Sequence, residues 1–112
     1  MKIVVSSKGA APSSEFDPRF GRAACFQAFD TESGVWHSDD NASSQSAAHG
    51  AGIQAAETVC GLGANIVISG HVGPKAFTVL AAGGVKVYCS IAQNALEAVK
   101  AFQRGELAEQ HE

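Results

Sequence analysis

Short apolar runs, separated by polar segments that contain glycine, recur along the chain and predict strands. The runs are rich in β-branched and aromatic residues, which is typical of strands. They cover residues 2–6, 25–30, 35–38, 66–68 and 85–88. A Thr-Glu-Ser-Gly turn at residues 31–34 joins the second run to the third, and it predicts a hairpin.

Apolar residues at helical spacing predict three helices in the second half of the chain. The first covers about residues 51–60. The second begins with Pro74 at its first position, and Gly83-Gly84 ends it. The third opens with a capping box, Ser90-x-x-Gln93, and stops at Gly105.

The resulting element order, βββαβαβα, predicts an α/β fold built on one mixed sheet. Right-handed crossovers through the first two helices place the five strands in the order 3-2-1-4-5, with only strand 2 antiparallel. We expect a single domain over residues 1–105 and a polar, frayed tail over residues 106–112. Strand 1 is the switch point of this sheet, and ligands bind at switch points in α/β folds.

This topology brings four loops to one edge of the sheet. The loops cover residues 7–23, 39–50, 70–74 and 89–91. The rim that they form carries the side chains of Lys8, Arg19, Arg22, His49 and His71. We therefore expect a local cationic site, although the net charge of the chain is −3.

Three motifs on this rim are candidates for ligand binding. Asp17-Pro18-Arg19-Phe20-Gly21-Arg22 offers two guanidinium forks to an anion, unless Asp17 pairs with one of them. His49-Gly50-Ala51-Gly52 precedes a helix, whose positive end favours an anion and a neutral imidazole. Gly70-His71-Val72-Gly73-Pro74 also opens a helix, and it matches neither a phosphate loop nor a dinucleotide fingerprint. Each histidine has a purely structural hydrogen-bonding role as its alternative.

Composition narrows the function classes. Hydrophobic residues make up 46% of the chain and charged residues 17%, which excludes a disordered chain. The acidic net charge argues against a nucleic-acid partner, and no apolar run is long enough to span a membrane. The N-terminus lacks a signal-peptide pattern, so we expect a cytoplasmic protein. Cys25, Cys60 and Cys89 have no disulfide or zinc-site spacing and are expected to be buried.

No catalytic set is recognisable. The sequence lacks the G-x-S-x-G and H-E-x-x-H patterns. Asp17, Asp39 and Asp40 are the nearest approach to a magnesium site, but the predicted strands supply almost no carboxylates to complete it. A hydrolase or nuclease is therefore the least favoured function.

The Asp17–Ala23, His49–Gly52 and Val67–Phe77 motifs together closely resemble the nitrogenase iron–molybdenum cofactor biosynthesis family, the NifX/NafY-like group. The resemblance continues through residues 84–88 and 95–102. It implies a ribonuclease-H-like, three-layer α/β fold and a non-catalytic carrier of an anionic metal–sulfur cluster. One branch, the orange proteins of sulfate-reducing anaerobes, implies a molybdenum–copper sulfide cluster. Nitrogenase-associated members imply a cluster of the iron–molybdenum type.

The resemblance also implies which residues hold the cluster. His49 and His71 are the candidate direct metal ligands. Arg19 stands where nitrogenase-linked members often carry histidine, and because arginine does not ligate metals, we expect the cluster to be held chiefly by electrostatics. The implied cofactor-binding residues are Arg19, Phe20, Gly21, Arg22, His49, Gly50, Gly52, Gly70, His71, Val72 and Gly73.

Two partner hypotheses stay open. A carrier requires a protein that receives its cluster. Alternatively, the chain is a cluster-free interaction or regulatory module that acts with a partner ATPase or a cell-division complex, through its charge-poor stretch between residues 41 and 96. We expect a monomer or a weak dimer, since an exposed edge strand is the one feature that favours self-association.

Overall fold

A computed structural model describes residues 1–111 of the protein. Its strands are β1 (Lys2–Ser7), β2 (Cys25–Asp30), β3 (Trp36–Asp40), β4 (Ile66–Ser69), β5 (Lys86–Cys89) and β6 (Ala108–Gln110). Its helices are α1 (Ala42–Gln45), α2 (Ala51–Gly61), α3 (Pro74–Ala82) and α4 (Ala95–Gln103). None of the described helices is long and apolar enough to cross a membrane.

The strands form one mixed sheet in the order β3-β2-β1-β4-β5-β6. The central strand β1 pairs in parallel with β4, and β4 pairs in parallel with β5. β2 is antiparallel to both of its neighbours. The predicted order of the first five strands and the reversed direction of strand 2 are confirmed. The ribonuclease-H-like assignment stays a prediction.

A sixth strand corrects the expectation of a frayed tail. Residues 108–110 pair antiparallel with residues 87–89 at the edge of the sheet. Only one of these three tail residues is apolar, so the sequence pattern gave no strand signal. The pairing satisfies backbone groups along β5 that would otherwise form an open edge.

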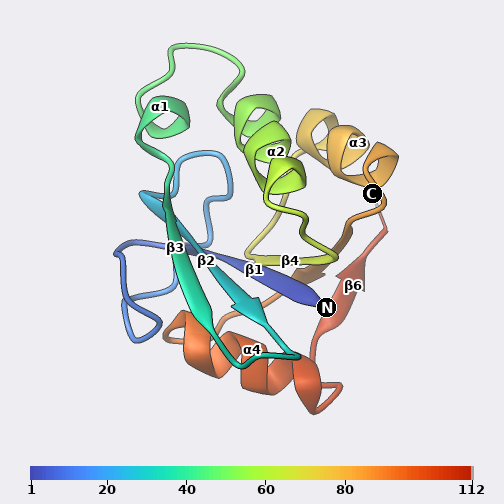
Figure 1. The fold of residues 1–112 in the computed structure, drawn as a ribbon. Coiled ribbons are helices and arrows are strands. Elements are labelled where there is room, and N and C mark those ends of the chain that lie inside the picture. Colours follow the sequence, from blue (N-terminus) through green and yellow to red (C-terminus); the bar gives the residue numbers. More distant parts are fainter. Residues whose placement is uncertain (112) are drawn as a thin grey trace.

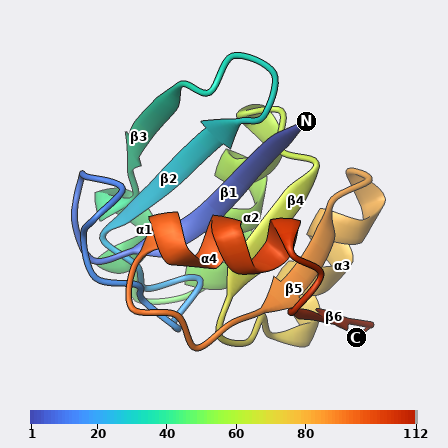
Figure 2. The ribbon, with the colours of Figure 1, turned by 90° about the horizontal axis from the view of Figure 1, so that it is seen from below.

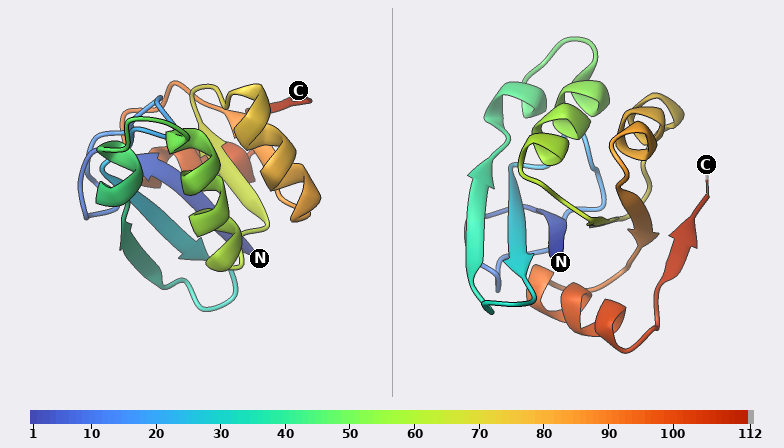
Figure 3. Two further views of the ribbon diagram at one scale, coloured as in Figure 1. Left: turned by 90° about the horizontal axis from the view of Figure 1, so that it is seen from above. Right: turned by 45° about the vertical axis from the view of Figure 1, so that its right-hand side comes forward.

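Helices cover both faces of the sheet. α2 and α3 lie on one face with the short α1 beside them, and α4 crosses the other face (Figures 1 and 2). The right-hand view of Figure 3 shows the sheet between these two helical layers. The three layers agree with the sequence-based expectation.

The core follows from the period-two alternation of side chains along β1. Val4 packs into the cluster under α2 and α3, whereas Ile3 and Val5 pack under α4. All three are fully buried, and burial of such a side chain contributes about 1.5–3 kcal/mol. A strand that is buried on both faces has a continuous run of apolar residues, and this explains the run at residues 3–5.

The helices differ from the prediction at two places. The short helix α1 lies inside the segment expected to be a loop, residues 39–50. The capping box at Ser90 and Gln93 is wrong, because α4 begins only at Ala95. Its cap is Asn94, whose side chain accepts a hydrogen bond of 2.8 Å from the backbone N–H of Glu97.

Candidate functional site

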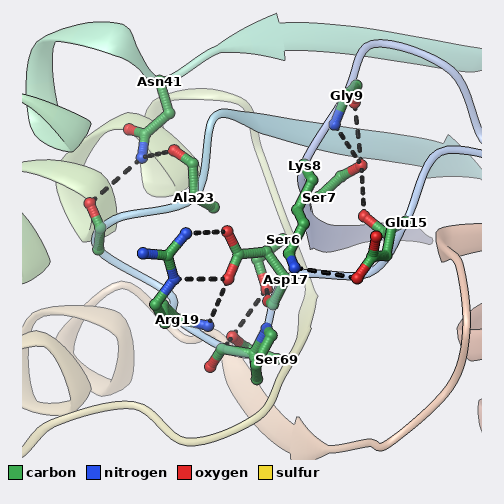
Figure 4. Close-up of polar contacts among 12 residues, drawn as sticks. Ser6, Ser7, Lys8, Gly9, Glu15, Asp17, Arg19, Ala23, Asn41 and Ser69 are labelled. Carbon is green, nitrogen blue, oxygen red and sulfur yellow. Dashed lines mark hydrogen bonds and ion pairs between the residues drawn. The ribbon is translucent and has the colours of Figure 1, made fainter.

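Two buried serines join the carboxyl ends of β1 and β4. The hydroxyl groups of Ser6 and Ser69 lie 2.7 Å apart, and the Ser6 hydroxyl donates to the Asp17 carbonyl at 2.6 Å (Figure 4). The Gly70 N–H donates to the Pro18 carbonyl at 3.2 Å. The two strand ends therefore anchor the loop that follows β1, at the switch point of the sheet.

Asp17 and Arg19 form an ion pair within this loop. Arg19 Nε and Nη2 donate to the two carboxylate oxygens at 3.1 and 3.0 Å (Figure 4). The Arg19 backbone N–H adds a third bond of 2.9 Å to the same side chain. The Asp17 side chain is 1% exposed and that of Arg19 is 62% exposed. Asp17 therefore pairs with Arg19 within the loop, which is the alternative that the motif left open.

The ion pair shifts the pKa values of both groups. Burial raises the pKa of Asp17, but hydrogen bonds from the side chain and backbone of Arg19, with the charges of Arg19 and Lys8, outweigh it and leave the pKa below 3.8. The hydrogen bond to Asp17 raises the pKa of Arg19 further above its already high usual value. Asp17 is therefore ionised at neutral pH and offsets the charge of Arg19.

Glycines allow the loops of this edge to pack closely. A Cβ atom on Gly70 would lie 2.5 Å from the Pro18 side chain. A Cβ atom on Gly21 would lie 2.8 Å from the backbone nitrogen of Gly52. Real Cβ atoms do not approach other atoms so closely, so these two glycines bring the first loop against β4 and the start of α2.

A cleft of about 550 Å³ opens between the first loop and the starts of α2 and α3. Phe20 forms part of its wall and packs against Phe26 in the core, with ring centroids 5.3 Å apart. The lining residues are Phe20, Gly21, Arg22, Gly50, Ala51, Gly52, Ile53, His71, Gly73, Pro74, Lys75 and Ala76.

Two helix N-termini meet at the cleft. Gly50 caps α2 and Gly73 caps α3, and neither helix has a side-chain cap. The first-turn N–H groups of a helix have no acceptor within the helix, and they carry the positive end of its dipole. Pro74 at the first position of α3 has no N–H to contribute. The remaining N–H groups of both first turns form an anion-binding geometry.

Three basic side chains border the cleft, and their environments differ. Arg22 donates through Nη1 to the carbonyl oxygens of Gln45 (3.1 Å) and Ala47, which fixes the segment before Gly50. His71 is exposed, and a backbone bridge links it to Arg19. Lys75 is exposed and has no hydrogen-bond or ion-pair partner among residues 1–111.

Seven of the eleven sequence-predicted residues line the cleft. They are Phe20, Gly21, Arg22, Gly50, Gly52, His71 and Gly73. The other four do not, and each is placed elsewhere for a physical reason. Arg19 turns to Asp17, and Gly70 packs on Pro18. Val72 is fully buried in the core, and His49 lies on the exposed segment before α2. Lys8, also expected on the rim, pairs with Glu15 at 2.9 Å.

Sequence reasoning missed two residues that matter here. Lys75 follows Pro74 in the first turn of α3, and this position next to a glycine loop was the available signal. Gln110 in β6 bonds both backbone groups of Val72. No local signal could have identified Gln110, because it lies 38 residues from Val72.

The described residues do not form a preformed metal-binding site at the cleft. No group of three or more His, Cys, Asp or Glu side chains among residues 1–111 is arranged to hold a metal ion. Burial and the nearby Glu57 raise the pKa of Cys60, which keeps that thiol protonated. The arrangement suits an anion held by N–H groups and cations, with an imidazole at hand, rather than a bare cation.

The chain is similar to one known protein family and to an individual protein of another organism. A family model described as dinitrogenase iron-molybdenum cofactor matches residues 1–105. An uncharacterised protein from Methanocaldococcus jannaschii is 29% identical over 92 residues, which is 80% of this chain and 78% of the relative.

Solved structures of similar proteins cover nearly the whole chain. The apo form of the orange protein from Desulfovibrio gigas is 38% identical, with a TM-score of 0.94 over 98% of this chain and 92% of that one. The solution structure of a putative NifB protein from Thermotoga is 36% identical, with a TM-score of 0.85 over 96% of this chain and 91% of that one.

Proposed function

The chain belongs to the dinitrogenase iron-molybdenum cofactor family, and from this premise we propose that it is a non-catalytic carrier of an anionic metal–sulfur cluster. The cluster is the cargo, and its place is the cleft between the first loop and the starts of α2 and α3. The observation that carries the proposal is the meeting of two helix N-termini that have no side-chain cap, beside Lys75, Arg22 and His71.

The chemistry of the lining supports a sulfide-rich anion. N–H groups and cations attract negative charge without demanding the geometry that phosphate oxygens require. Apolar walls from Phe20, Ile53 and Ala76 suit the weakly hydrated surface of a metal sulfide. The cleft volume of about 550 Å³ is large enough for a polynuclear complex.

The sequence suggested two direct metal ligands, His49 and His71, and of these His71 lines the cleft. Its imidazole nitrogens are good ligands for copper and iron. His49 precedes Gly50 on the exposed segment and is a candidate only if that segment moves toward the cargo. The absence of a three-ligand group in residues 1–111 supports a hold that is chiefly electrostatic.

Of the two cluster types, we favour the molybdenum–copper sulfide type over the iron–molybdenum type. The support is the 38% identity and near-complete overlap with the orange protein. Arg19 supports the same choice, because a guanidinium already bound to Asp17 leaves no metal ligand at that position. The proposed carrier acts in the cytoplasm as a monomer or weak dimer and transfers its cluster to a protein partner.

The decisive experiment is metal analysis and a visible spectrum of protein isolated anaerobically from its native host. The carrier proposal predicts molybdenum with copper or iron, and sulfide charge-transfer bands. Recombinant apoprotein is then mixed with tetrathiomolybdate and Cu(I) and passed through a desalting column. Native protein without metal, together with recombinant protein that retains no tetrathiomolybdate, would overturn the proposal.

A further inference from the structure

Gln110, in β6, makes hydrogen bonds to both backbone polar groups of the buried residue Val72. Its Nε2 donates to the Val72 carbonyl at 2.6 Å, and its Oε1 accepts from the Val72 N–H at 3.0 Å. Gln110 is 8% exposed and Val72 is fully buried. The opposite amide orientation would set donor against donor and acceptor against acceptor, so the contact fixes how the amide lies. The Cys89 thiol also donates to Oε1, at 3.8 Å.

Val72 stands between two residues that line the cleft, His71 and Gly73. This segment is neither helix nor a regular strand, so no ladder of repeated hydrogen bonds fixes it. At the start of the segment, His71 is attached to the first loop through its bridge to Arg19. Within residues 1–111, the hydrogen bonds found for Val72 are the two that it makes with Gln110.

β6 is itself a marginal element. It has three residues and pairs with β5 alone, at the edge of the sheet. Short edge elements open with lower free energy than central strands. The position of the cleft segment therefore depends on an element that opens easily.

We propose that Gln110 is a positioning residue for the cleft, and that β6 pairing and cargo binding are coupled through its amide. This inference rests on the proposed carrier function. When β6 is paired, Gln110 holds Val72, and His71 and Gly73 face the cleft. When β6 opens, Val72 loses both polar partners and the segment relaxes. Because coupling between two sites is reciprocal, cargo in the cleft stabilises β6, and loss of β6 pairing promotes release.

The test compares Gln110→Met with Glu109→Gln. Methionine keeps the length of the side chain and removes both polar contacts with Val72. Glu109 is the neighbouring residue of β6, pairs with Tyr88 on β5, and makes no bond to Val72. Amide hydrogen exchange of the apoproteins and the Kd for tetrathiomolybdate are measured well below the unfolding temperature.

In Gln110→Met we expect faster exchange at Val72 and Gly73 and a Kd raised about tenfold or more, which is typical when a group that orients a binding residue is lost. Glu109→Gln should match the wild type in both. In the wild-type protein, tetrathiomolybdate should slow exchange of the β6 amides. This last measurement needs no variant and decides the coupling even if Gln110→Met does not fold.

The outcomes separate the two proposals. Wild-type protein that binds tetrathiomolybdate with unchanged β6 exchange, or Gln110→Met with the wild-type Kd, would overturn the coupling and leave the carrier standing. Wild-type protein that binds no tetrathiomolybdate would count against the carrier and remove the coupling with it. Exchange at Val72 in the apoproteins still decides whether Gln110 positions the segment.

Discussion

Asp17 determines how much positive charge the cleft can offer to an anion. It occupies both guanidinium donors of Arg19 that face it, so this arginine shapes the loop more than it attracts cargo. Lys75 has no such counter-charge among residues 1–111. Arg19, one of the residues expected to bind the cargo, is thus paired with Asp17, whereas Lys75, which the sequence analysis did not single out, lines the cleft.

Asp17→Asn should lower the free energy of unfolding at pH 7 by about 1–3 kcal/mol, because a buried, charge-assisted set of hydrogen bonds loses its acceptor. The folded pKa of Asp17 lies below 3.8. Its stabilising contribution is therefore fully present above about pH 4 and is lost as the pH falls through the folded pKa. Urea unfolding at pH 7 and near pH 2.5 measures both effects.

The difference between Asp17→Asn and wild type should shrink at the lower pH, because the carboxyl of the unfolded chain is then protonated and the ion pair contributes less to stability. Glu15→Gln is the matched control, since its pair with Lys8 is exposed and should contribute little. A difference that stays constant across this pH range would contradict the assigned role of the ion pair.

Lys75→Ala should weaken tetrathiomolybdate binding about fivefold, the effect of one charge near a partly exposed anion. Lys86→Ala is its control, because Lys86 is also exposed but begins β5, away from the cleft. Isothermal titration under anaerobic conditions measures both. Equal losses in the two variants would indicate general charge attraction rather than a site at the start of α3.

At the scale of elements, the site is a meeting of helix starts rather than a cluster of ligands. The starts of α2 and α3 come together because Gly52 faces Ala76, where even a Cβ atom would approach to 3.3 Å. The first loop closes the third side through Gly21. Small residues at these contacts let the backbones of the first loop and the two helix starts come close together beside the cleft.

Gly21→Ala should disturb this junction. Its Cβ atom would meet backbone atoms of Gly52 and Ala51 that lack the freedom of a flexible side chain. We expect a loss of about 1–3 kcal/mol in unfolding free energy, as for overpacking, and weaker tetrathiomolybdate binding.

Gly61→Ala is the control for this prediction. Gly61 ends α2, is exposed, and has open space at its Cβ position. Its replacement should leave binding unchanged and stability equal or slightly higher, by up to about 1 kcal/mol. Thermal unfolding and titration of both variants give the comparison, and similar effects at both positions would refute the junction argument.

At the scale of the whole molecule, the charge distribution sets an ionic-strength dependence. The chain carries a net charge of −3, yet the cleft presents Arg22, His71 and Lys75. A polyanion is therefore attracted locally and repelled at long range. Both effects are screened by salt, and the local one weakens only when the screening length approaches the size of the contact.

Tetrathiomolybdate binding should weaken several-fold when NaCl is raised from about 0.1 M to about 1 M, which shortens the screening length from about 10 Å to about 3 Å. Titrations across this range measure the slope, and the Lys75→Ala protein should show a smaller one. Affinity independent of salt would instead indicate direct ligation of the metal by protein atoms.

The sequence determined the elements with the strongest local signals. Apolar runs located five of the six strands, and Pro74 with Gly83 bounded α3. It also located much of the cleft lining, because loops that follow parallel strands meet at one edge. It misplaced the start of α4, because Ser90 and Asn94 are both residue types that cap helices well, and only Asn94 caps this helix.

Tertiary structure alone decided which of these residues act together. Whether Asp17 neutralises Arg19 depends on where a flexible loop places two side chains, and the motif allows either outcome. β6 forms because β5 presents an edge for it, and Gln110 reaches Val72 across 38 residues. Local propensity reflects a residue's near neighbours in the chain, whereas hydrogen bonds and charge pairs of this kind are set by proximity in space. Local sequence therefore determines the strands and loops of the site. The pairing of Asp17 with Arg19 and the position of the cleft walls are set by the tertiary structure.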